Sequence, residues 1–156
     1  MKMALIYYSL TGNTEYVAKE ISKRLNVDVF KINLKKDFPK KGFKKYFICG
    51  KSASLEEDVI FECKCDLEKY DSIIFGTPIW ASNISSPLRS YINYNIEKIK
   101  NKKIYVYLCY MGGGESKALN KLSDCLKGNT FQHLVLRNPL YVDNSKLIES
   151  FCKSVK

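Results

Sequence analysis

The stretch Met3-Ala4-Leu5-Ile6-Tyr7-Tyr8-Ser9-Leu10-Thr11-Gly12-Asn13-Thr14 decides the fold of this chain. Its first six residues form a continuous apolar run that ends at turn-forming residues, which is typical of a strand buried on both faces. A helix is expected next, because Val17, Ile21 and Leu25 recur at four-residue spacing. Asn13 or Thr14 is placed to cap the start of that helix. The stretch therefore predicts a buried strand, a polar turn and a helix in direct succession.

The same order of strand and helix recurs along the rest of the chain. Further strands are predicted at residues 27–32, 72–78, 104–109 and 131–136, and a last helix at about 144–155. This alternation predicts a three-layer α/β domain with a doubly wound, five-stranded parallel sheet. Residues 1–156 are expected to form one domain, because this length matches a single core.

The order of the strands follows from their polarity. The second and fifth strands carry interior polar residues, such as Asp28 and His133, whereas the other three are more apolar. Strands at the edge of a sheet are the ones that tolerate polar residues, so these two are predicted as edges and the strand order as 2-1-3-4-5. Residues 33–71 interrupt the pattern and are expected to hold one short helix, in which Phe43, Tyr46 and Phe47 have helical spacing, and a short extended arm.

The net charge and the cysteines bear on three classes of function: nucleic-acid binding, secretion and metal binding. The net charge is +10, with lysines concentrated at residues 35–45, yet no nucleic-acid-binding module is present, so a solvated basic surface is the preferred interpretation. The six cysteines are expected to be reduced thiols in a cytoplasmic protein, because no secretory signal or membrane span is visible. Cys63 and Cys65 lack a second ligand pair, so no metal site is predicted.

Ligands of open parallel sheets bind beyond the carboxyl ends of the strands, where the strand order reverses, which here is between the first and third strands. Three loops meet at that point and are predicted to form one binding site. The residues of these loops are Ser9, Leu10, Thr11, Gly12, Asn13, Thr14, Thr77, Pro78, Ile79, Trp80, Ala81, Ser82, Asn83, Tyr110, Met111, Gly112, Gly113 and Gly114.

The first of these loops, residues 9–14, has the chemistry of an anion site. Three hydroxyls, one amide and the free backbone N–H groups of a helix N-terminus converge there, and the helix dipole favours negative charge. The same residue types also suit a plain helix cap. Taken alone, the loop leaves the two interpretations equal.

Taken together, the three loops resemble the flavodoxin family. Ser9-Leu10-Thr11-Gly12-Asn13-Thr14 is similar to the family's phosphate signature T/S-x-T-G-x-T, and residues 76–81 resemble its loop after the third strand, where Trp80 fills the place of an aromatic that packs on the flavin ring. Residues 109–115 resemble the loop that borders the other side of the ring. One departure is that relatives commonly carry a glycine soon after the aromatic, where this chain has Ala81, Ser82 and Asn83; of these, Asn83 best tolerates a positive φ.

The resemblance implies that FMN is the cofactor and that the protein transfers electrons without a catalytic side chain of its own. The alternative is an NAD(P)H-dependent FMN or quinone reductase on the same fold, and a third possibility is a flavin-free module that binds another anion. Redox proteins, with acidic ones suited to the basic surface, are the expected partners. A monomer or weak dimer is expected, with no nucleic acid and no membrane span.

Overall fold

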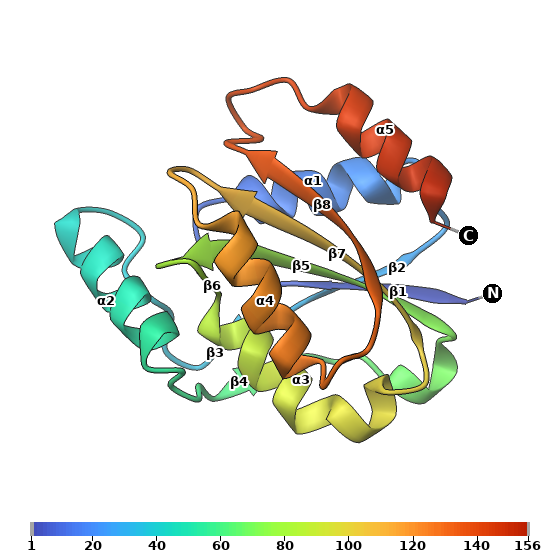
Figure 1. The fold of residues 1–156 in the computed structure, drawn as a ribbon, viewed down its shortest axis with the longest axis horizontal. Coiled ribbons are helices and arrows are strands. Elements are labelled where there is room, and N and C mark those ends of the chain that lie inside the picture. Colours follow the sequence, from blue (N-terminus) through green and yellow to red (C-terminus); the bar gives the residue numbers. More distant parts are fainter. Residues whose placement is uncertain (1, 156) are drawn as a thin grey trace.

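Five parallel strands form the centre of the computed structural model, which describes residues 2–155. The strands are β1 (Met3–Tyr7), β2 (Asp28–Lys31), β5 (Ser72–Trp80), β7 (Lys103–Tyr110) and β8 (Phe131–Arg137). Their order is β2-β1-β5-β7-β8, and every neighbouring pair is parallel (Figure 1). The predicted α/β class and the predicted strand order are thus confirmed.

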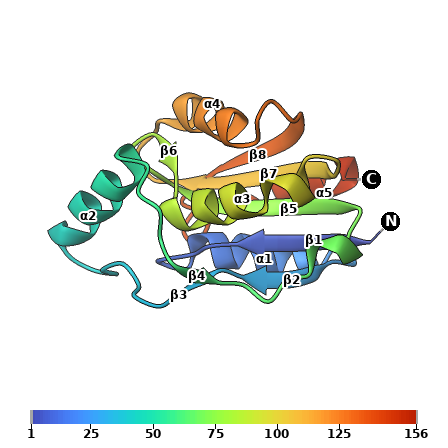
Figure 2. The same ribbon diagram turned by 90° about the horizontal axis from the view of Figure 1, so that it is seen from below.

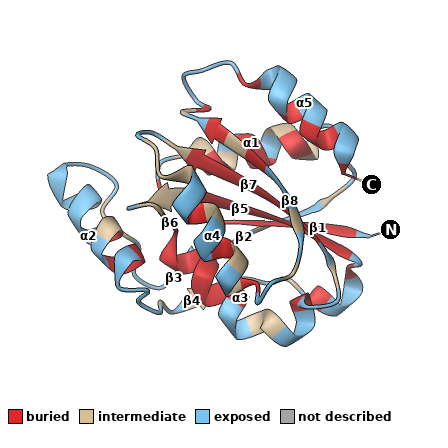
Figure 3. Cartoon of the chain, viewed as in Figure 1, coloured by how far each residue is buried: buried red, intermediate tan, exposed pale blue. Residues whose placement is uncertain are grey.

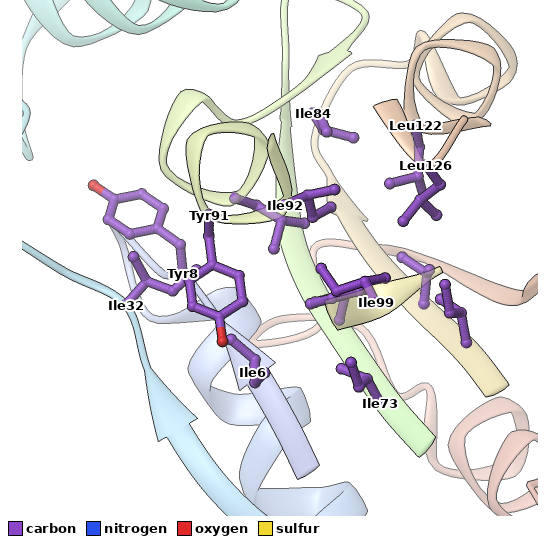
Figure 4. Packing of buried hydrophobic residues seen from close by; sticks show 14 of the residues in the cluster. Ile6, Tyr8, Ile32, Ile73, Ile84, Tyr91, Ile92, Ile99, Leu122 and Leu126 are labelled. Atoms are coloured by element: carbon purple, nitrogen blue, oxygen red, sulfur yellow. The ribbon is translucent and has the colours of Figure 1, made fainter. Parts of the chain in front are cut away.

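Helices cover both faces of the sheet (Figure 2). They are α1 (Asn13–Ser22), α3 (Ser86–Ile99), α4 (Glu115–Cys125) and α5 (Ser145–Ser154). Two separate apolar clusters result, one beneath α3 and α4 and the other beneath α1 and α5. Figure 4 shows part of the first cluster, which joins Ile92 and Ile99 of α3, Leu122 of α4, Leu126 at the end of α4 and Ile73 of β5; of these, Ile99 lies near Ile73, and the two leucines lie under α4. Burying each side chain of this kind contributes roughly 1.5–3 kcal/mol, so the two layers of helix fix the sheet between them.

The burial of the strands follows the polarity of their sequences. All five residues of β1 are buried, whereas β2 has three exposed residues out of four. β8, at the opposite edge of the sheet, has two buried residues out of seven, Leu134 and Leu136. The prediction that the second and fifth strands form the edges is therefore confirmed.

The third strand of the sheet is longer than predicted. The prediction ended this strand at Pro78 and placed Trp80 in a loop, but β5 continues through Trp80. The chain then turns at residues 81 and 82 and returns as β6 (Asn83–Ile84), which pairs antiparallel with the end of β5. The prediction of a loop at Trp80 was wrong because the hairpin supplies strand hydrogen bonds that a parallel-sheet pattern does not anticipate.

The segment between β2 and β5 holds the least regular part of the fold. A short antiparallel pair joins β3 (Asn33–Leu34) to β4 (Phe61–Glu62), and a 3-10 helix, η1, spans Leu67–Lys69. Between β3 and β4 lies α2 (Phe43–Ser54), a helix of 12 residues that stands beside the edge where the strands end (Figures 1 and 2). The helix and the extended segment after it were both predicted.

The aromatic residues of α2 lie on its outside. Apolar residues at helical spacing usually mark the face that packs on the core. Here the buried residues are the small ones, Cys49, Ser52 and Ala53, while Phe43 and Phe47 are 84% and 67% exposed. Figure 3 shows α2 as largely exposed along its length.

Candidate functional site

A cavity of about 750 Å³ lies at the carboxyl ends of β1, β5 and β7, where the strand order reverses. Its volume is within the usual range of small-molecule and cofactor sites, about 300–1,000 Å³. The predicted residues that line it are Ser9, Leu10, Thr11, Asn13, Thr14, Pro78, Ile79, Trp80, Ala81, Ser82, Tyr110, Met111, Gly112, Gly113 and Gly114. All three predicted loops therefore meet in one cavity.

The polar loop before α1 does not cap the helix with its side chains. The N-cap is Gly12, whose φ of 97° is left-handed, so the expectation that Asn13 or Thr14 caps the helix was wrong. The Ser9 hydroxyl accepts a hydrogen bond from the Gly12 N–H at 3.2 Å, and the side-chain amide oxygen of Asn13 accepts one from the N–H of Leu140 at 3.2 Å. The first N–H groups of a helix have no partner within it. Asn13 and Thr14 lie at the cavity wall, so this helix start faces the cavity, which favours the interpretation as an anion site over a side-chain cap.

Thr14 is fixed from behind by a buried tyrosine. The hydroxyl of Tyr107, on β7, donates a hydrogen bond to the Thr14 carbonyl at 3.0 Å. The Tyr107 ring lies against Gly76 of β5, where an added Cβ would be 2.2 Å from the ring, so only glycine leaves room for it. Burial raises the pKa of the Cys109 thiol to about 12, partly offset by a hydrogen bond with Thr14. The start of α1 is thus held by the central strands of the sheet.

Trp80 forms a wall of the cavity, and two other aromatic rings hold it in place. The ring of Tyr8 meets it edge-on at 5.7 Å between centroids, and the ring of Phe38 does so at 4.9 Å. The Tyr8 hydroxyl donates to a carboxylate oxygen of Asp37 at 2.7 Å. Burial, together with this hydrogen bond, raises the pKa of Tyr8. Edge-to-face pairs of this kind contribute about 0.5–1.5 kcal/mol each beyond area burial, so the indole is held rigidly.

The turn after Trp80 is strained. Ala81 and Ser82 have φ values of 48° and 60°, which place both central residues of a two-residue hairpin in the left-handed region. Glycine or asparagine usually fills such positions. The turn is held by Gly114, because a Cβ there would lie 2.4 Å from the Ser82 hydroxyl and 2.9 Å from its Cα. Strain of this kind is typical of ligand-binding loops.

Three predicted residues lie outside the set that lines the cavity: Gly12, Thr77 and Asn83. Gly12 shapes the loop before α1, while Thr77 is fully buried and lies 2.9 Å from the Ser85 hydroxyl. Asn83 does not have the positive φ expected of it, because the turn places Ala81 and Ser82 in the left-handed region in its stead. Instead its amide donates to the Ala53 carbonyl at 2.9 Å and fastens the hairpin to α2.

The sequence analysis missed the contribution of α2. Lys45, Tyr46, Cys49 and Gly50 line the cavity, together with Cys109 at the end of β7. Cys109 directly precedes the predicted Tyr110, so its position at the carboxyl end of the strand could have identified it as a cavity residue. Nothing in the sequence indicated that α2 would stand at this edge of the sheet.

The electrostatics of the cavity suit a ligand with an anionic group and a planar apolar body. Lys45 is the one charged residue among the described residues that line it, and its ammonium lies 4.5 Å from the centroid of the Tyr46 ring. Burial raises the pKa of the Cys49 thiol to about 11, so this thiol is protonated at neutral pH. Within residues 2–155, no histidine or carboxylate lines the cavity. A phosphate at the start of α1 and a flat ring beside Trp80 fit these residues.

The described residues hold neither a membrane-spanning helix nor a metal-binding cluster. Between residues 2 and 155, no helix combines the length and apolar character that a bilayer crossing requires. In the same part of the chain, no cluster of three or more histidine, cysteine, aspartate or glutamate side chains is arranged to hold a metal ion.

Comparison with known proteins agrees with the geometry. The family model described as NADPH-dependent FMN reductase matches residues 1–146. A flavodoxin of Haemophilus influenzae is 32% identical over 78 residues, and the match covers 50% of this chain and 31% of the flavodoxin's own length. The chain thus matches about a third of that curated relative.

Two solved structures share the fold at low identity. A flavoprotein of Lactobacillus acidophilus, determined in complex with FMN, has a TM-score of 0.73 and 17% identity, and the alignment covers 93% of this chain and 98% of that one. The two-electron reduced flavodoxin of Megasphaera elsdenii has a TM-score of 0.57 and 18% identity, with 97% and 99% covered. Because the family model spans nearly the whole sequence, the chain belongs to the NADPH-dependent FMN reductase family as a flavodoxin-like protein that binds FMN.

Proposed function

We propose that this protein carries electrons between redox proteins. FMN, when bound, supplies the electron-accepting and electron-donating ring, and the protein supplies binding, orientation and electrostatics. Residues 9–14 bind the phosphate through N–H groups and hydroxyls, and Trp80 offers its face or edge to the ring. No step requires a side chain that donates or accepts a proton, which agrees with a cavity wall free of carboxylates and histidine in the described chain.

The observation that carries this proposal is the position of α2. Lys45 and Tyr46 line the cavity, and the same helix exposes Phe43 and Phe47 to solvent. A small substrate needs no apolar surface outside the cavity. A protein partner does, because protein interfaces are enriched in aromatic residues. The exposed aromatics beside the cavity thus favour a protein as the partner in electron transfer.

A second candidate is supported by the family match. Members of the matched family are described as NADPH-dependent FMN reductases, so direct reduction by NADPH is the competing function. In that case residues 9–14 and Trp80 would hold FMN, and its ring would supply the hydride chemistry with NADPH.

One experiment separates the two candidates. The protein is loaded with FMN, and NADPH is added without oxygen while the visible flavin absorbance is recorded. For a carrier, we expect no bleaching by NADPH, and after photoreduction we expect rapid reduction of ferric cytochrome b5 in a stopped-flow instrument. Rapid bleaching by NADPH would establish the reductase instead. Protein that takes up no FMN would refute both.

A further inference from the structure

The solvent side of α2 carries both large aromatic rings and lysine side chains. Phe43 and Phe47 lie one helical turn apart, and Lys44 and Lys51 occupy the same exposed side. We call Phe43, Lys44, Phe47, Lys51 and the preceding Lys41 the α2 face. The opposite side of the helix is the one that packs on the protein, through Cys49, Ser52 and Ala53.

The polarity of this helix is reversed relative to an ordinary surface helix. A helix that only covers a core places large apolar residues inward and charges outward. This helix buries a thiol, a hydroxyl and a methyl group and exposes two phenylalanine rings. Leaving such rings in water forgoes roughly 1.5–3 kcal/mol of burial each. Binding of a partner to the α2 face recovers that free energy.

The lysines around the two phenylalanine rings indicate the charge that a partner needs. Residues 35–51 contain seven lysines and one aspartate. Within residues 2–155, Lys41, Lys44 and Lys51 form no ion pair, whereas Lys40 lies 3.8 Å from Asp37. A second copy of this chain would place lysines against lysines, which is repulsive. An acidic surface would meet them with favourable charge on every side.

The α2 face is also continuous with the cavity. Lys45 and Tyr46 belong to the same helical turn as Lys44 and Phe47, and both line the cavity. Figure 2 shows α2 standing beyond the ends of the strands, on the side where the cavity lies. A protein seated on the α2 face is therefore next to the mouth of the flavin site.

We propose that the α2 face is the docking surface for an acidic redox protein, with Phe43 and Phe47 as the apolar centre and Lys41, Lys44 and Lys51 as the charged rim. This inference rests on the proposed function as an electron carrier. It adds the docking surface of this protein, the residues that form that surface and the charge of the partner. Electrostatic steering of this kind raises association rates by roughly 10–1,000-fold at low ionic strength.

The test measures binding separately from electron transfer. The FMN-loaded protein is titrated calorimetrically with two oxidised haem proteins as probes, the acidic cytochrome b5 and the basic cytochrome c, at low salt. We expect binding of cytochrome b5 alone, with affinity that falls as salt rises because the Debye length shortens to about 10 Å at 0.1 M ionic strength.

Matched variants locate the surface. Lys44→Glu and Phe47→Ser are each expected to weaken cytochrome b5 binding by about tenfold, which corresponds to 1.4 kcal/mol. The controls are Lys146→Glu and Leu147→Ser, which change the same chemistry at exposed positions of α5, on the other side of the sheet. Neither control is expected to change binding by more than about twofold. FMN affinity should be unchanged in all four variants, because none of these residues lines the cavity.

The outcomes that overturn the proposal are distinct from those that overturn the carrier function. Equal weakening by the α5 controls, or equal binding of cytochrome c, would show that the α2 face is not the docking surface. Sedimentation with phosphatidylserine vesicles that is lost in Phe47→Ser would assign the α2 face to a membrane surface instead. If cytochrome b5 binds as expected but the photoreduced protein passes it no electron, the docking surface stands and the carrier function fails.

Discussion

Replacing Tyr107 by phenylalanine removes the hydrogen bond that fixes the start of α1. The buried Tyr107 hydroxyl donates to the Thr14 carbonyl at 3.0 Å, across 93 residues of sequence, while its ring fills the space left by Gly76. Phenylalanine keeps the ring and removes the donor alone. Since Thr14 lies within α1, its carbonyl also belongs to the hydrogen-bond pattern of the helix, so we expect a net loss near that of one ordinary bond, about 0.5–1.5 kcal/mol.

This loss is expected to appear in phosphate binding. Loosening the first turn of α1 should disorder the N–H groups that we propose bind the phosphate, and 1.4 kcal/mol equals a tenfold change in Kd. We therefore expect the Kd for FMN to rise by up to about tenfold in Tyr107→Phe. Riboflavin has the same ring and no phosphate, so its Kd should stay nearly constant. The assay is quenching of protein fluorescence on titration with each flavin.

The matched control is Tyr91→Phe. Tyr91 is also buried, but its hydroxyl has no standard hydrogen-bond partner among the described residues, with only the weakly bonding thiols of Cys63 and Cys65 nearby. It does not line the cavity, so we expect no change in either flavin's Kd. If Tyr107→Phe leaves the ratio of the Kd for FMN to the Kd for riboflavin unchanged, the role assigned to this tyrosine is refuted.

Three further predictions concern the cavity rim and the thiols. Gly114→Ala should cost about 1–3 kcal/mol more than Gly128→Ala in chemical unfolding, because both glycines have positive φ but only a Cβ at residue 114 overlaps Ser82. Ala81→Gly should raise the stability by up to about 1 kcal/mol, because glycine relieves the left-handed strain at φ 48° in the hairpin turn, and a lowered melting temperature would contradict this. Burial raises the pKa of Cys49 to about 11 in the folded protein, whereas an unfolded cysteine has a pKa of about 8.5. Between these values the unfolded chain loses the thiol proton before the folded one does, so the contribution of Cys49 to the free energy of unfolding is complete below about pH 8.5 and is lost as pH rises towards 11. The urea midpoint should fall across that window, and less steeply in Cys49→Ala; equal slopes would count against it.

The parts of the fold that the sequence predicted are those set by local pattern. Continuous apolar runs such as Ile73–Phe75 indicated buried strands, and polar residues such as Asp28 indicated an edge strand, because both signals depend on burial within the strand itself. The glycine, hydroxyl and amide content of residues 9–14 predicted the polar loop for the same reason. Strand order then placed the loops beside one another.

The parts that the sequence did not predict depend on contacts between distant residues. β5 continues through Trp80 because β6 pairs with it, and β6 is fastened by the bond from Asn83 to Ala53 on α2. The left-handed turn falls on Ala81 and Ser82 in place of Asn83, because hairpin register and the contact with Gly114 set those angles. No local pattern reports such contacts.

The central claim is that residues 9–14 bind the phosphate of FMN while Trp80 borders its ring. Trp80 is the single tryptophan of the chain and lines the cavity, so its fluorescence reports directly on that site. The most direct measurement is a fluorescence titration of the apoprotein with FMN and, separately, with riboflavin. The account predicts strong quenching by both flavins at saturation, one FMN bound per chain, and affinity for FMN at least tenfold above that for riboflavin, the equivalent of 1.4 kcal/mol or more from the phosphate. Equal affinity for the two flavins, or no quenching by FMN, would contradict it.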